Sequence, residues 1–134
     1  MPTGDGDFSY ADDAELVAQF VSWTTDAVTE LRGIADTLTG DEVRTDSQSD
    51  RIYDLTHNIK GMGASFNFPL MTHAGSSLCT YLKDLAPDQK VSQKVVDAHV
   101  RVFEVVLEHQ IQGDGGEKGS ALQARLAAII GEES

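Results

Sequence analysis

The chain has 134 residues, which suits one domain, and 22 acidic against 10 basic side chains give it a formal net charge of −12. A nucleic-acid binder needs a basic face toward the phosphates, and an anionic membrane repels an acidic surface, so we expect neither partner. No apolar run reaches the roughly 18–20 residues of a membrane span, and the first residues lack the apolar stretch of a signal peptide. We therefore expect a cytoplasmic protein.

Two further features of the composition narrow the chemistry. The first fifty positions hold 12 acidic and 2 basic side chains. We expect this charge to coat a solvated face, with the steering of a partner as the alternative. The single cysteine, Cys79, excludes a disulfide within the chain and a zinc site made of a cysteine cluster. The histidines and carboxylates also lack the paired spacing of a di-metal bundle site, so we expect no metal and no cofactor.

Five segments carry apolar residues at every third or fourth position, the spacing of helices with one buried face. We expect residues 1–10 to be flexible and residues 11–134 to form a single domain. The expected helices span residues 12–38, 49–66, 69–85, 92–111 and 120–130. Gly33 is a point at which the first helix could break. Asn67 is suited to stop the second helix in a left-handed conformation, and Pro69 is suited to start the third.

These helices predict an all-α fold. Short connections between long amphipathic helices favour an antiparallel four-helix bundle with an additional C-terminal helix. We expect a flexible break before the last helix, at glycines 113, 115, 116 and 119. Trp23 is expected in the core, and His99 at the edge of the core with a hydrogen-bonded nitrogen. Cys79 is expected to pack as a small residue, His73 to lie at the rim of the active face and His109 to lie on the surface.

The second helix has an unusual outward face. Its apolar residues share one sector of a helical wheel: Ile52, Leu55, Ile59, Met62 and Phe66. His57 lies opposite this sector, and Lys60, Gly61 and Ala64 share its outward side. A glycine within a helix costs about 0.5–1 kcal/mol relative to alanine, and Gly61 and Gly63 incur that cost twice. One physical reason is that a partner must approach the backbone beside His57, so this face suits an accessible nucleophile next to a cation.

The segment that begins H57-N-I-K-G61 resembles the H-x-x-K-G motif of histidine phosphotransfer (HPt) domains, and most closely the form found in chemotaxis-type histidine kinases. In that form an aromatic–glycine–aromatic stop follows, and here it corresponds to Phe66-Asn67-Phe68. Asparagine tolerates the left-handed conformation, so the change from glycine is mild. The resemblance covers about residues 12–111 and is strong only from His57 to Leu82.

One position departs from the family pattern. HPt domains commonly place Glu or Gln on the following helix, 22 residues after the histidine, where it bonds the imidazole. Cys79 occupies that position here, level with His57 in an antiparallel hairpin, and cysteine is a poor hydrogen-bond acceptor. Ser76, one turn away, could take the place of the missing acceptor.

The resemblance implies that His57 accepts a phosphoryl group from a receiver-domain aspartate or a histidine kinase and passes it to a response-regulator receiver domain. Lys60 would balance the phosphoryl charge, and Asp54, Gly61 and Ala64 would contact the docked partner. The sequence has no glycine-rich phosphate loop and no ATP-site pattern, so we expect a phosphotransfer protein without kinase activity of its own. Magnesium is expected on the receiver, and the protein is expected to be a monomer.

Two alternatives stay open. The chain could be an adaptor that is never phosphorylated and binds a receiver or kinase only through its surface, although the His57–Lys60 pair argues against this. It could also be a phosphotransfer domain cut from a larger chemotaxis-type kinase. We expect a standalone protein.

Overall fold

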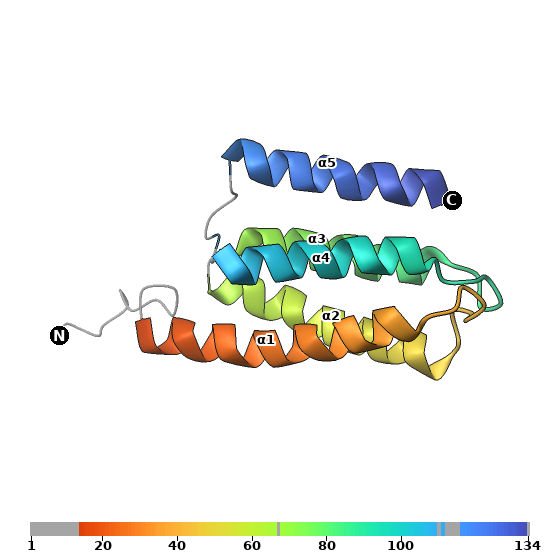
Figure 1. Cartoon of the computed structure of the whole chain (residues 1–134), viewed down its shortest axis with the longest axis horizontal. Helices are drawn as coiled ribbons and strands as arrows, with labels where there is room; N and C mark the ends of the chain where they lie inside the picture. The colour runs from red at the N-terminus through yellow and green to blue at the C-terminus, as the bar shows by residue number, and fades with distance from the viewer. Residues whose placement is uncertain (1–13, 67, 110, 112–115, 134) are drawn as a thin grey trace.

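The described part of the chain is all-helical. The computed structural model describes residues 14–66, 68–109, 111 and 116–133. Its helices are α1 (Ala14–Thr37), α2 (Ser47–Ser65), α3 (Pro69–Asp84), α4 (Gln93–His109) and α5 (Gly116–Glu133), as Figure 1 shows. Within these ranges no strand forms, and an isolated antiparallel bridge joins Val43 to Lys90 at one end of the molecule. The predicted all-α class is confirmed.

Local chemistry explains where the helices begin. The Asp46 carboxylate accepts a hydrogen bond from the Gln48 N–H at 2.8 Å, so α2 starts two residues before the expected position. Pro69 opens α3, as predicted, because proline lacks only an N–H that the first turn leaves unpaired. The expected stop at Asn67, the flexible segment 1–10 and part of the glycine break lie outside the described residues.

Three predictions about glycines are wrong. Gly33 does not interrupt α1, because its exposed position tolerates the lost propensity without a change of path. Gly116 and Gly119 belong to α5 and not to a break before it. Gly119 is buried, so packing of the first turns of α5 offsets the low helix propensity of glycine.

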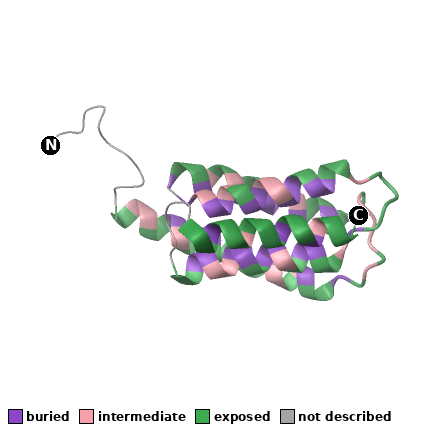
Figure 2. Ribbon diagram, turned by 90° about the horizontal axis from the view of Figure 1, so that it is seen from above, coloured by how far each residue is buried: buried purple, intermediate pink, exposed green. Residues whose placement is uncertain are grey.

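The helices pack as a bundle in which the neighbours are α1 with α2 and α4, and α3 with α2 and α4, while α5 lies against α3 and α4. Figure 2 shows the buried faces turned toward one another and the exposed faces turned outward. This arrangement is compatible with a four-helix bundle plus a fifth helix. None of the helices in the described ranges is long and apolar enough to cross a membrane.

Helices α2 and α3 pack closely, and two glycines allow it. A Cβ on Gly75 would lie 2.8 Å from Cβ of Lys60, and a Cβ on Gly63 would lie 2.9 Å from Cβ of Met71. Real Cβ atoms do not come so close, so the two backbones can pack at this distance only without these side chains. Gly63 is therefore a packing glycine, which corrects the expectation that it leaves room for a partner.

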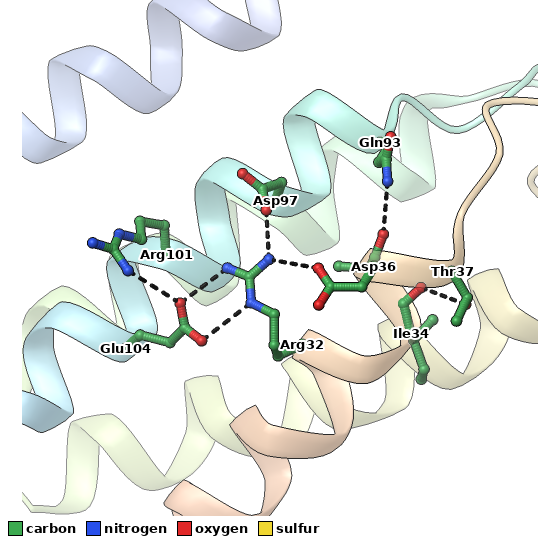
Figure 3. A network of polar contacts seen from close by, with 9 residues as sticks. Arg32, Ile34, Asp36, Thr37, Gln93, Asp97, Arg101 and Glu104 are labelled. Carbon is green, nitrogen blue, oxygen red and sulfur yellow. Dashed lines mark hydrogen bonds and ion pairs between the residues drawn. The ribbon is translucent and has the colours of Figure 1, made fainter.

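An ion-pair network joins α1 to α4. The Arg32 guanidinium on α1 donates to both carboxylate oxygens of Glu104, at 2.9 and 3.1 Å, and it also donates to Asp97 on α4 and Asp36 on α1 (Figure 3). Arginine suits this position because its planar fork can bond several carboxylates at once. The network links α1 to α4.

Trp23 is not a core residue, which corrects the sequence prediction. Its side chain is 54% exposed, whereas Phe20 is buried and stacks on Phe66 and Phe68 with ring centroids 4.8 and 5.1 Å apart. The buried positions of α1 form a stripe rotated away from Trp23: Phe20, Thr24, Val28, Leu31 and Ala35. The sequence pattern placed Trp23 in the core because it counts large apolar residues, and it passed over Thr24, a polar residue that is buried here.

His99 is fully buried in α4, which corrects its expected position at the edge of the core. The predicted hydrogen-bonded nitrogen is confirmed, and the second ring nitrogen also has a partner. Nδ1 lies 2.7 Å from the Val95 carbonyl, which can only accept, so Nδ1 carries the proton. Nε2 then accepts from the Ser77 hydroxyl at 2.8 Å. This arrangement uses the neutral imidazole.

Burial lowers the pKa of His99 below its ordinary value, so the folded state binds fewer protons at this site than the unfolded state. The stability that this difference provides is complete above the unfolded pKa of about 6.5 and is lost as the pH falls below it, at a rate of at most about 1.4 kcal/mol per pH unit. The free energy of unfolding, measured with urea at several pH values between about 7.5 and 5.5, should fall less steeply with falling pH for His99→Gln than for the wild type. An equal pH dependence of the free energy of unfolding in the two proteins would contradict the lowered pKa of His99. His109→Gln, at an exposed position, is the control and should behave like the wild type.

Candidate functional site

The outward face of α2 carries the candidate site. His57 is exposed, while Ile52, Leu55 and Ile59 of the same helix are buried. The opposition between His57 and the core side of α2 agrees with the helical wheel. The imidazole is thus open to a partner and is carried by a helix whose other side is anchored in the core.

Lys60 stands one turn after His57, and its stem is fixed at the α2–α3 contact. The Thr72 hydroxyl of α3 donates to the Lys60 carbonyl at 3.0 Å, and the Lys60 Cβ lies over Gly75. Burial raises the pKa of the Cys79 thiol, and the positive charges of Lys60 and Lys83 act against that shift. The backbone and Cβ of Lys60 therefore lie on the α3 side of His57.

The surface beside His57 carries small residues at two positions on its C-terminal side. Gly61 is exposed, and a Cβ placed on it would meet no other atom within 4 Å. Ala64, one turn further, is exposed with a single methyl group, and Asp54 is exposed one turn before. The two glycines therefore differ: Gly61 faces open space, as expected for access of a partner, whereas Gly63 faces α3.

The acceptor that would orient the imidazole is not found on α3. The contacts of Gly63 and Gly75 set an antiparallel register in which Cys79 lies within one residue of the level of His57, as predicted, and Cys79 is buried. Ser76 lines a hollow between α3 and α5 together with His73 and Ile130. Among the described residues, no hydrogen bond joins His57 to Cys79 or Ser76, so their supporting role stays a prediction.

Two stacked rings lie along α2, a feature that was not predicted from the sequence. The ring of Tyr53, one turn before His57, lies nearly parallel to the imidazole, with centroids 6.2 Å apart and planes 10° apart. The Arg44 guanidinium sits over the Tyr53 ring at 5.6 Å from its centroid. The spacing of four residues between Tyr53 and His57 was a signal that could have been noticed.

A second missed feature is a groove of about 280 Å³ between α1 and α2. Exposed Trp23 stands in its wall, with Leu55 and Met62 among the apolar residues that line it. Arg51 of α2 pairs with Glu30 of α1 at 2.6 and 2.9 Å and links the two helices there. Asn58 also lines the groove, which places the groove on the side of His57 away from α3.

The described residues hold no group of three histidine, cysteine, aspartate or glutamate side chains that could bind a metal ion. Comparisons of the chain with protein-family models, with curated proteins and with solved structures give no match.

Proposed function

We propose that the protein is a histidine phosphotransfer protein with an antiparallel four-helix bundle and an additional C-terminal helix. In this proposal His57 takes a phosphoryl group from a receiver-domain aspartate or a histidine kinase and passes it to a response-regulator receiver domain. The observation that supports it best is the exposed imidazole of His57 on a firmly packed helix, with the Lys60 cation one turn away and open space over Gly61.

The chemistry is a simple displacement at phosphorus. The lone pair of an unprotonated ring nitrogen of His57 forms the N–P bond as the O–P bond to the receiver aspartate breaks, and the aspartate leaves as a carboxylate. The reverse step delivers the phosphoryl group to a second receiver. Lys60 supplies positive charge beside the transferred group, and any magnesium belongs to the acidic pocket of the receiver.

The proposal is tested by a phosphotransfer profile. Each receiver domain of the source organism is purified, phosphorylated and mixed with this chain, and transfer of label is followed with time. At least one receiver should exchange its phosphoryl group with the chain within seconds to minutes. If none does so, and no histidine kinase labels the chain, the proposed function is wrong.

Lys60→Ala should slow transfer without abolishing it. A charge-assisted contact contributes roughly 1.5–3 kcal/mol, and less when it is exposed, so a fall of about ten- to a hundredfold is the upper limit. The rate of transfer from the best receiver is measured at saturating receiver concentration. Lys83→Ala, at an exposed position on α3, is the matched control. An unchanged rate for Lys60→Ala would show that this lysine is only a solvated surface group.

The groove beside Trp23 favours a second candidate function, that of an adaptor that docks a receiver without chemistry. In both functions we infer that the groove takes an amphipathic helix of the receiver with an apolar residue next to a lysine or arginine. The reason is charge: Glu30 and Arg51 neutralise each other, while Asp26 in the same groove has no ion pair within the described ranges. Binding that persists in His57→Gln, with no phosphoryl transfer in the wild type, would identify the adaptor.

Trp23→Ala should raise the receiver concentration needed for half-maximal transfer by about five- to thirtyfold, as expected for loss of an exposed aromatic anchor worth about 1–2 kcal/mol. The maximal rate should change little. Asp26→Lys should weaken binding as well, because it repels a basic helix. Thr25→Ala, on the opposite side of α1, is the control. If Trp23→Ala binds like the wild type, the groove is not the docking site.

A further inference from the structure

The imidazole of His57 needs something to hold its plane, and hydrogen bonding does not supply it. Among the described residues His57 has no hydrogen-bond partner, and buried Cys79 is a poor acceptor. A ring that turns freely about its side-chain bonds would present its nitrogens in many directions. The entropy lost on reaching the reactive orientation would then slow the reaction.

The contact that restricts the ring is the one with Tyr53. The two rings are 6.2 Å apart between centroids and 10° apart in plane, which is within the range of offset stacking. Because the lone pair of the unprotonated nitrogen and the N–H of the other nitrogen both point outward in the ring plane, a neighbour on the ring face leaves both nitrogens accessible. Stacking thus restrains the plane of the nucleophile without blocking its reactive atoms.

Tyr53 is itself held in place from the other side. The Arg44 guanidinium lies 5.6 Å from the centroid of the Tyr53 ring, a favourable cation–π distance. Arg44 is fixed in turn, because its Nε donates to the Leu82 carbonyl of α3 at 2.7 Å and its terminal nitrogen pairs with Asp50 at 3.2 Å. A continuous series of contacts therefore runs from the backbone of α3 through Arg44 and Tyr53 to His57.

We propose that Tyr53, backed by Arg44, is the positioning residue for His57 and does by ring stacking what a hydrogen-bond acceptor on α3 would otherwise do. The inference rests on the proposed function, since it concerns the same nucleophile. It explains how the site can work with Cys79 at the level of His57. It also gives a role to the loop before α2, which carries Arg44.

The experiment uses phosphoramidate as the donor, because so small a molecule has no docking surface and reports on the imidazole alone. The N–P bond of phosphoramidate breaks, the phosphoryl group passes to the ring nitrogen, and ammonia leaves. Tyr53→Leu should reduce the rate of labelling about two- to tenfold. Tyr53→Phe keeps the ring and should react like the wild type, and Arg44→Gln should lie between the two.

Proton NMR of the full chain gives a second readout that a merely structural role would not move. The carbon-bound ring protons of His57 should shift in Tyr53→Leu, where the neighbouring ring current is lost, and keep their positions in Tyr53→Phe. Thermal unfolding shows whether each variant folds. If Tyr53→Leu does not fold, the comparison of Arg44→Gln with the wild type decides, and an unchanged rate and spectrum there overturns the inference.

The remaining outcomes separate the two proposals. Equal labelling rates in wild type and Tyr53→Leu overturn the inference and leave the proposed function intact. An equal loss in Tyr53→Phe and Tyr53→Leu also overturns it, because the hydroxyl and not the stack would then matter. Labelling by phosphoramidate that depends on Tyr53, without exchange with any receiver or kinase, supports the inference and refutes the proposed function.

Discussion

His57→Gln should accept no phosphoryl group from any receiver, kinase or small donor, and it should unfold at the same temperature as the wild type. Both expectations follow from the position of His57. The side chain is exposed on the outward face of α2, so its removal takes nothing from the core, while glutamine cannot form a stable N–P bond in its place. The measurement is labelling by a phosphorylated receiver, compared with thermal unfolding of the same sample.

His73→Gln is the matched control, because His73 is also an exposed helical histidine, one that faces the hollow between α3 and α5. It should be labelled like the wild type. Label retained by His57→Gln, or lost from His73→Gln, would assign the nucleophile to another residue. The label on the wild type should be lost in acid and stable in alkali, unlike a phosphoserine.

Gly61→Gln should block transfer between proteins and leave the fold as stable as before, or slightly more stable. Glutamine is the better helix former by about half a kcal/mol or more, and a Cβ at this position meets no atom within 4 Å. A receiver, however, must bring its aspartate and metal ion close over the backbone next to His57, where the new side chain would stand. Transfer rates and urea unfolding of one preparation measure the two effects.

Gly63→Gln is the natural contrast on the same helix. Its Cβ would lie 2.9 Å from both Met71 Cβ and Thr72 Oγ1 and 3.0 Å from the Phe68 carbonyl, so α2 and α3 would have to separate. We expect a loss of about 1–3 kcal/mol of stability or more, typical of overpacking. If Gly61→Gln unfolds the protein, or Gly63→Gln leaves its stability unchanged, the outward face of α2 is wrongly assigned. The exposed position of His57 on that face would then be wrong as well.

The helices could be predicted from the sequence because each depends mainly on its own apolar period and on its ends. The stripe on α2 needs only residues of that helix, and it placed His57 outward before any neighbour was known. α1 shows the limit. Its buried stripe includes Thr24 and leaves out Trp23, and that rotation depends on how closely α1 approaches the other helices, which no local pattern contains.

The site could be predicted only in part for the same reason. His57, Lys60 and Gly61 belong to one short motif on one helix. The role of Gly75, by contrast, exists only because α3 packs against the backbone at Lys60. Arg44 lies in a loop, contacts the Tyr53 ring, and is held there by a hydrogen bond to the Leu82 carbonyl, 38 residues away in the chain. Sequence spacing gives no sign of either contact.

The measurement that tests the central claim most directly is the mapping of the phosphoryl group on the wild-type chain. The full chain is incubated with the phosphorylated receiver that exchanges fastest, digested at neutral or alkaline pH, and analysed by mass spectrometry. We expect one modified peptide, with the phosphoryl group on His57 and none on His73, His99 or His109. A phosphoryl group on any other residue, or no modified peptide with any receiver or kinase, would contradict the proposal that His57 is the phosphotransfer site.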